Sequence, residues 1–320
     1  MCQRIQHARH ISTRSPLRRA VVAAGTTLCM LLASLAAQAQ VLVMPDSTNN
    51  RLVTFSPLTG AVVSSSLFGL AGGTPLHALG VGDEIWVSEQ TGDRVSRWSA
   101  DGAQLGQVGG DVSGGLDNVR GMARVGSTVF ITNAGAGNGA PGAAVVMVSS
   151  NGAAMGSFST AATAPSPFGL LAYLGGWLVS SSAANDDVHR HSLAGAPLGT
   201  FHNSATLNFA EQMAYASNGD VLVAGFSSNN IVRLNAATGA VLTTYVASGA
   251  RGVAQLANGN LMWTSGAGAF VLNVNTGTSA LVYAGGGRYL ELITVVPEPA
   301  TALLWAGGLL ALAAAARRRG

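Results

Sequence analysis

Six polar residues that recur at equivalent places along the chain could together form a binding site. They are two arginines, two glutamates, a histidine and a glutamine: His77, Arg120, Glu211, Gln212, Arg251 and Glu291. Paired arginines can bind a carboxylate or a sugar acid through two parallel hydrogen bonds. Two carboxylates with an amide oxygen could instead hold Ca²⁺. The alternative is that the opposite charges only neutralise one another.

A repeated strand pattern must position these residues. Short apolar runs recur at intervals of about 40 to 48 residues, at 41–43, 85–87, 129–131, 177–179, 221–223 and 261–263. A polar turn, a second short strand, a Gly-containing turn and a third strand follow each run. Turns such as Asp101-Gly102 and Asn151-Gly152 favour hairpins because their residues accept a positive φ. Four short antiparallel strands per repeat indicate an all-β, six-bladed β-propeller.

The two ends of the repeat region predict how the ring closes. The first repeat begins directly with its second strand, at Val41, whereas 288–296 is a lone strand after the sixth repeat. That strand can complete the first blade and thereby cover both exposed sheet edges. Closure would bring the six candidate residues to one mouth of the channel, with these triplets aligned: 76–78, 120–122, 168–170, 211–213, 251–253 and 290–292.

The repeats also resemble a known family. Arg251-Gly252-Val253-Ala254, followed by 259–263, is similar to an NHL-type repeat, and this resemblance implies the propeller fold alone. Two other architectures remain open. One is a seven-bladed ring with a degenerate blade, and the other is a β-sandwich with long hairpins.

The amino-terminal residues predict export. Residues 1–19 are basic and acid-free, 20–37 are apolar, and Ala37-Gln38-Ala39 offers small residues where a signal peptidase cleaves. Residues 1–39 are therefore interpreted as a signal peptide cleaved after Ala39. Both cysteines of the chain lie within it, so the mature protein would contain none, which suits an oxidising compartment.

The carboxy-terminal residues predict sorting. Pro297-Glu298-Pro299 precedes an apolar run to Ala316, and Arg317-Arg318-Arg319 follows. As a helix, 300–316 would extend about 25 Å, just enough to cross a membrane core, and the arginines would remain cytoplasmic. Residues 296–320 thus resemble the PEP-CTERM sorting signal of Gram-negative bacteria that make extracellular polysaccharide. The resemblance implies a transmembrane helix in 297–320, an exosortase-type membrane protease as partner, and transient anchoring in the inner membrane before transfer to the cell surface or extracellular matrix.

Two further groups could bind a metal. The acidic and amide turns at 46–50, 89–93, 185–187 and 229–230 should lie on one face, and 185–187 could join a Ca²⁺ site. Asp and Asn also form turns for purely structural reasons. His189 and His191 alternate along a strand and so share one face, but the sequence identifies no third ligand beside them.

The function that these features favour is binding rather than catalysis. The formal charge of +3 resides in the two ends, and 40–296 is net acidic, so nucleic acid is not an expected partner. No nucleophile elbow, His-Glu-x-x-His sequence or phosphate-binding loop is present. We therefore expect an exported, non-enzymatic propeller, without a cofactor, that binds extracellular polysaccharide or an envelope protein. The alternative is a calcium-dependent lactonase or hydrolase with its metal in the channel, because six-bladed lactonases share this shape.

Overall fold

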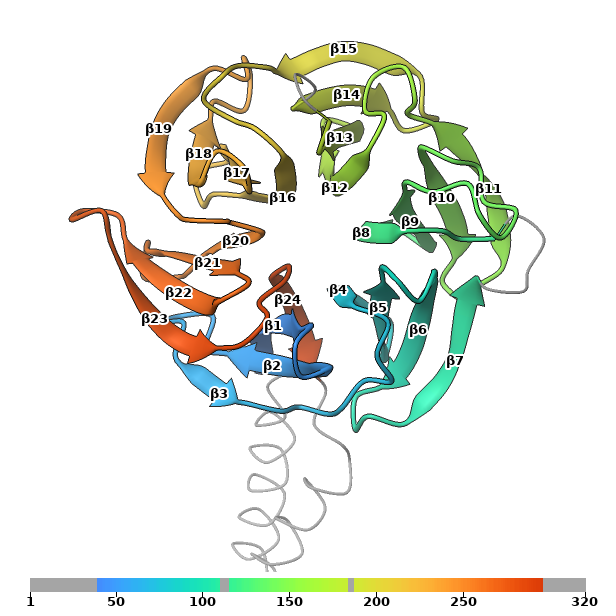
Figure 1. Cartoon of the computed structure of the whole chain (residues 1–320), viewed down its shortest axis with the longest axis horizontal. Helices are drawn as coiled ribbons and strands as arrows, with labels where there is room; N and C mark the ends of the chain where they lie inside the picture. Colours follow the sequence, from blue (N-terminus) through green and yellow to red (C-terminus); the bar gives the residue numbers. More distant parts are fainter. Residues whose placement is uncertain (1–38, 110–114, 184–186, 296–320) are drawn as a thin grey trace, which may run out of the picture. The chain divides into compact units, whose positions relative to one another are not determined.

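The computed structural model describes residues 39–109, 115–183 and 187–295. These residues form 24 strands in six four-stranded sheets, and one compact unit spans Gln40–Val295. The sheets are arranged as blades around a central axis (Figure 1). The prediction of an all-β, six-bladed propeller is confirmed. The expected signal peptide (1–39, but for the backbone of Ala39) and sorting segment (297–320) lie outside the described residues.

Each blade has one inner strand beside the axis and three strands outside it. From the axis outward, the blades are β24 (Glu291–Val295), β1 (Ala39–Asp46), β2 (Arg51–Phe55) and β3 (Val62–Ser64); β4 (Pro75–Val81), β5 (Glu84–Glu89), β6 (Arg94–Ser99) and β7 (Gln104–Gly109); β8 (Val119–Val125), β9 (Thr128–Asn133), β10 (Ala144–Ser149) and β11 (Ala154–Ser159); β12 (Pro167–Tyr173), β13 (Gly176–Ser181), β14 (Val188–Ser192) and β15 (Pro197–His202); β16 (Ala210–Tyr215), β17 (Val221–Gly225), β18 (Asn230–Leu234) and β19 (Val241–Val246); β20 (Gly252–Gln255), β21 (Leu261–Ser265), β22 (Gly268–Asn273) and β23 (Thr278–Ala284).

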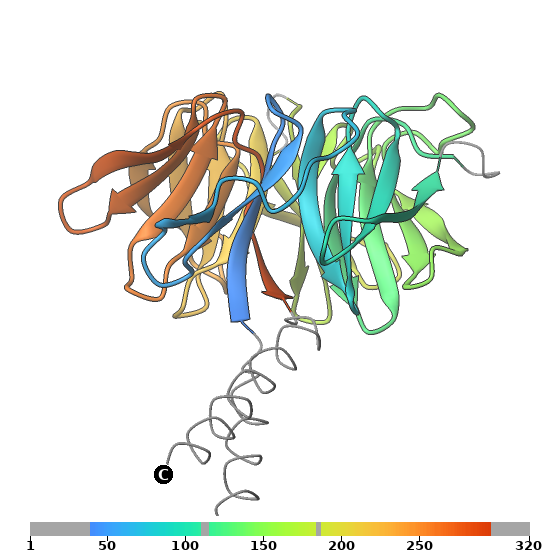
Figure 2. The ribbon, with the colours of Figure 1, turned by 90° about the horizontal axis from the view of Figure 1, so that it is seen from below.

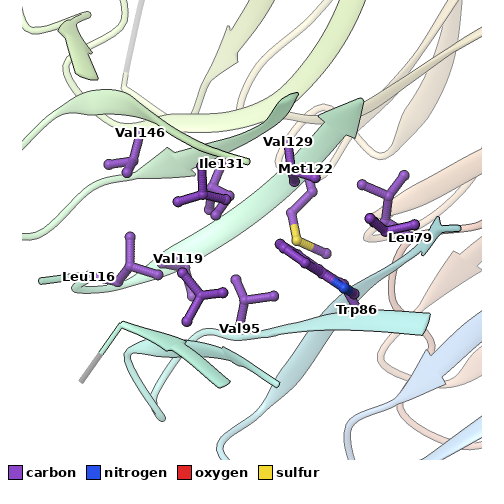
Figure 3. Packing of buried hydrophobic residues seen from close by; sticks show 12 residues of the cluster. Leu79, Trp86, Val95, Leu116, Val119, Met122, Val129, Ile131 and Val146 are labelled. Atoms are coloured by element: carbon purple, nitrogen blue, oxygen red, sulfur yellow. The ribbon is translucent and has the colours of Figure 1, made fainter. Parts of the chain in front are cut away.

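The apolar runs of the sequence are the second strands of the blades. They are buried on both sides because each blade packs between two others; every residue of β13 is buried, for example, whereas β11 is mostly exposed. Figure 3 shows one such interface, where Trp86 of β5 and Met122 of β8 pack together between the second and third blades. Face-to-face packing of this kind gives a sheet protein its core.

The last strand closes the ring as the sequence predicts. β24 pairs with β1 and completes the first blade, although it begins at Glu291 rather than at Arg288. Figure 2 shows that β1 begins and β24 ends on the same face of the ring. We call this the bottom face, where the inner strands end, and the opposite face, where they begin, the top face.

Asp46, at the end of β1, fastens this closure at the top face. Its side chain is fully buried. Oδ1 accepts hydrogen bonds from the backbone N–H groups of Thr48, Asn49 and Gly286, and Oδ2 accepts them from Asn49 Nδ2 and the Tyr283 hydroxyl. The turn 46–50 is therefore structural, and it joins the first blade to the segment after the sixth.

The inner strands approach one another very closely at the axis. A Cβ on Gly121, Gly169 or Gly252 would lie 2.5, 2.3 or 2.5 Å from a carbonyl oxygen of the next blade, which only glycine avoids. Hydroxyl groups bridge four of the blade junctions. The bonds run from Ser88 to Arg120 O (2.6 Å), Thr132 to Phe168 O (2.7 Å), Ser180 to Glu211 O (2.6 Å) and Thr264 to Arg288 O (2.6 Å).

Within 39–109, 115–183 and 187–295, no helix has the length and apolar character needed to span a membrane.

Replacing Asp46 with Ala should destabilise the closed ring. The change leaves buried N–H and O–H donors unpaired, so we expect the free energy of unfolding to fall by about 2 to 4 kcal/mol. Denaturant unfolding of the variant and the wild type measures the difference. Asp83→Ala, in the exposed turn between β4 and β5, is the matched control and should change little; equal stability of all three proteins would show that Asp46 does not fasten the ring.

Candidate functional site

Three arginines, one glutamate and one tyrosine interact at the axis, towards the top face. We call Arg120, Glu211, Arg251, Arg288 and Tyr289 the axial cluster. Each member lies at the start of an inner strand or just before it, and the members come from four different blades. The cluster therefore exists only because the ring closes.

Glu211 is the only carboxylate of the axial cluster. Its side chain is 1% exposed, and its Oε2 has no hydrogen-bond partner. Burial raises the pKa of Glu211 to about 7, and the guanidinium groups of Arg251, Arg288 and Arg120 only partly oppose that rise. Burial thus favours the protonated form of this carboxyl more than is usual for a glutamate.

Each arginine of the axial cluster is held in place by its surroundings. Arg120 donates to Ser166 Oγ (2.9 Å) and to the carbonyl of Pro167 (3.0 Å), and Arg288 Nε donates to Ser47 Oγ (2.8 Å). Burial lowers the pKa of both arginines to about 10, so both remain cations at neutral pH. Arg251 is less constrained, because its Nε is buried without a partner.

A row of aromatic rings connects two of the arginines. The Arg120 guanidinium lies 3.8 Å from the centre of the Phe168 ring, and that of Arg251 lies 4.8 Å from the Phe226 ring. Phe209 stands between them, with ring centres 5.2 Å from Phe168 and 5.1 Å from Phe226. Phe209 and Phe226 are only partly buried, so apolar surface is accessible beside the charges.

Tyr289 lies at the centre of the ring. It is 1% exposed, its ring packs on His77 at a centroid distance of 5.4 Å, and its hydroxyl has no hydrogen-bond partner. Burial raises the pKa of Tyr289 well above its usual value, so the hydroxyl keeps its proton and can donate it to an acceptor.

The other sequence candidates, His77, Gln212 and Glu291, form their hydrogen bonds outside the axial cluster, although His77 packs on Tyr289. His77 Nδ1 accepts a hydrogen bond from Met122 N (2.9 Å), so its proton is on Nε2, which lies 3.3 Å from Glu291 Oε2. Gln212 bonds only to backbone groups: Oε1 accepts from Val253 N and Leu290 N, and Nε2 donates to Leu290 O. His77 and Gln212 thus hold inner strands together across the axis.

The predicted alignment is two residues out of register in the last inner strand. Thr264 bonds to the carbonyl of Arg288 as Ser180 bonds to that of Glu211, so Arg288 and not Leu290 is the equivalent of Glu211. Sequence reasoning therefore missed Arg288 and Tyr289. The clue to the correct register was the buried apolar residue two positions later in each segment: Leu290 corresponds to Met213.

A cavity of about 330 Å³ occupies the channel on the bottom side of Tyr289. His77, Gln212, Tyr289 and Glu291 line it together with apolar residues of the inner strands. A neighbouring cavity of about 530 Å³ shares Gln212 and Glu291 with it. Glu291 therefore faces the bottom half of the channel, whereas Glu211 belongs to the axial cluster.

The described residues contain no group of three His, Cys, Asp or Glu side chains arranged to hold a metal ion. His189 and His191 are both buried. His191 Nε2 lies 3.0 Å from Thr163 Oγ1, and burial together with His189 lowers the pKa of His191.

Comparison with known proteins supports the fold. No protein-family model matches the chain, and no curated protein matches it. Among solved structures, it is similar to a protein of unknown function from Bacteroides caccae, with 16% identity and a TM-score of 0.59 over 79% of this chain and 98% of that one.

Two further similar structures belong to proteins of different kinds. A chain of a nidogen/laminin complex has 10% identity and a TM-score of 0.66, with 81% of this chain and 100% of that one covered. Virginiamycin B lyase from Staphylococcus aureus has 11% identity and a TM-score of 0.54, with 82% and 83% covered. At these identities the similarity shows a shared fold and carries no function.

Glu211 should make stability depend on pH. Its pKa of about 7 in the folded protein exceeds the ordinary value of 4.5, so the folded state holds the proton more tightly. The resulting stabilisation is complete below pH 4.5 and is lost as the pH rises towards and past 7. Between pH 5 and 8, the wild type should lose about 2.5 kcal/mol relative to Glu211→Gln.

Urea unfolding of the two proteins at pH 5, 6.5 and 8 measures this difference. Glu84→Gln is the matched control, because hydrogen bonds from Arg97 lower the pKa of Glu84, so its removal should leave the loss between pH 5 and 8 in place. Parallel curves for wild type and Glu211→Gln would contradict the assignment.

Proposed function

We propose that this chain is an exported, non-enzymatic binding propeller whose axial cluster holds a uronate residue of an acidic extracellular polysaccharide. The observation that carries the proposal is the convergence of three guanidinium groups on one buried carboxyl whose Oε2 has no hydrogen-bond partner. Such a site has an excess of positive charge. A ligand carboxylate supplies the missing negative charge and can accept from the unpartnered Arg251 Nε and Tyr289 hydroxyl.

The aromatic row suits a sugar ring. Phe209 and Phe226 offer partly exposed faces beside the cations, and the C–H face of a pyranose can pack against such apolar surface while its carboxylate reaches Arg251. An envelope protein is the other class of partner that the sequence suggests. The clustered guanidinium groups favour the acidic sugar.

The electrostatics oppose the calcium-dependent alternative. A divalent cation would need several oxygen ligands. Glu211 is the only carboxylate in the axial cluster and faces three cations, and Glu291, the second carboxylate that the alternative requires, lies in the bottom half of the channel beside His77. We therefore propose a function without Ca²⁺ and without turnover.

Export and sorting complete the proposal. The signal sequence ending at Ala39 and the PEP-CTERM-like segment 297–320 support transfer across the inner membrane and processing by an exosortase-type protease. The NHL-like repeats would then act at the cell surface or in the extracellular matrix. This part of the proposal rests on the sequence.

Replacing Arg251 with Gln should weaken binding of uronate-rich oligosaccharides about tenfold or more, because one charged donor is lost. Calorimetric titration with polygalacturonate fragments measures the affinity, which should also fall as salt is added. Arg124→Gln is the matched control, since Arg124 is exposed at the other end of β8. Absence of binding by the wild type, or equal affinity of all three proteins, would refute the polysaccharide proposal.

Replacing Pro297, Glu298 and Pro299 with Ala should stop processing and leave the full-size precursor in the inner membrane. Fractionation and immunoblotting of the producing cells measure this accumulation. The repeat region should be digested when protease is added to spheroplasts from outside. A region that stays intact there would show that export does not occur.

A further inference from the structure

We propose that Glu211 selects carboxylate ligands at the axial cluster by taking up one proton as the ligand binds, so that its protonated carboxyl donates a hydrogen bond to the ligand carboxylate. This inference rests on the proposed function and deepens it. It makes the site specific for an acid and makes its affinity depend on pH.

The geometry that supports this proposal is a buried carboxyl with a free acceptor atom. Glu211 is 1% exposed, and Oε2 accepts no hydrogen bond. Its carbonyl oxygen accepts a hydrogen bond from Ser180 Oγ at 2.6 Å and packs closely on Gly169, where an added Cβ would lie 2.3 Å away. These contacts position the backbone of Glu211 at the blade junction. The Glu211 carboxyl must therefore meet the ligand carboxylate at this position.

A second carboxylate beside Glu211 raises the pKa of Glu211 further, because neighbouring like charges disfavour the ionised form. A uronate that reaches Arg251 places its charge close to Glu211. The proton then goes to Glu211, because that carboxyl is the buried one and already holds its proton up to about pH 7. The balance is simple: a ligand carboxylate, ionised Glu211 and one proton from solvent form one hydrogen-bonded pair, and no covalent bond changes.

The surrounding groups make Glu211 the acceptor of this proton. Arg120 from β8, Arg251 before β20 and Arg288 before β24 face it. The pKa values of Arg120 and Arg288 remain about 10, and the Tyr289 hydroxyl stays protonated. His77 packs on Tyr289, but both its ring nitrogens are engaged, by Met122 N and by Glu291. Glu211 is therefore the group of the cluster that can gain a proton near neutral pH.

The charges of the axial cluster should make it select a uronate over a neutral sugar. A neutral sugar leaves the guanidinium groups without an added anion and gives protonated Glu211 no charged acceptor. A uronate supplies both. Glu211→Gln should keep a neutral donor of similar size at the same place, so it should still bind a uronate, but without proton uptake.

Calorimetric titration of the full-length protein with polygalacturonate fragments tests this inference. At pH 8, in buffers of different ionisation enthalpy such as HEPES and Tris, the wild type should take up nearly one proton per ligand. Glu211→Gln should take up nearly none. The affinity of the wild type should fall about fivefold from pH 7 to 8 and about tenfold from pH 8 to 9, and that of the variant should stay level.

The outcomes separate this inference from the proposed function. Binding by the wild type without proton uptake would overturn the role of Glu211 and leave the polysaccharide site in place. No binding by the wild type would overturn both. If the Gln variant does not fold, the buffer dependence of the wild type alone decides. Neutral galactan fragments are the ligand control and should bind at least tenfold more weakly; equal binding would overturn the proposed selectivity.

Discussion

The close approach of neighbouring inner strands at the axis is the constraint on which the rest of this structure depends. A carbonyl oxygen of one blade lies against the Cα of Gly121, Gly169 or Gly252 in the blade before it, so closely that a Cβ would overlap it. Hydroxyl groups of Ser88, Thr132, Ser180 and Thr264 then bond to four of the carbonyls at that level. The backbone that carries the axial side chains is thereby fixed before a ligand binds. Ligand binding then costs less conformational entropy.

The other two blade junctions do not use a hydroxyl bridge of this kind. They use Gln212, a site residue predicted from the sequence, and Tyr289, a member of the axial cluster. At Gln212 the backbone N–H donates to Arg251 O (3.2 Å), and the side-chain amide binds three backbone groups. At Tyr289 the backbone N–H donates to Leu76 O (3.1 Å), and the ring packs in a buried cluster with Leu76 and Phe168. Tyr289 both interacts with the charges of the axial cluster and lines the cavity towards the bottom face.

Much of the fold could be predicted from the sequence because it depends on local patterns. Apolar runs such as 85–87 mark second strands, and the strand left over after the sixth repeat must complete the first blade. The site was harder to predict because it depends on register at the axis. Glu291 alternates with leucines as a strand residue should, yet the place equivalent to Glu211 belongs to Arg288, before β24 begins. The roles of His77 and Gln212 depend on partners such as Met122 and Leu290, 45 and 78 residues away, which no local pattern reveals.

The central claim is that the axial cluster is a site for a ligand carboxylate, and a crystal structure of the protein soaked with galacturonate tests it most directly. The account predicts density for the carboxylate between Arg251 and Glu211, within hydrogen-bond distance of Arg251 Nε and Glu211 Oε2. Density at another place, or a direct ion pair between Glu211 and an arginine that leaves no room for the ligand, would contradict it.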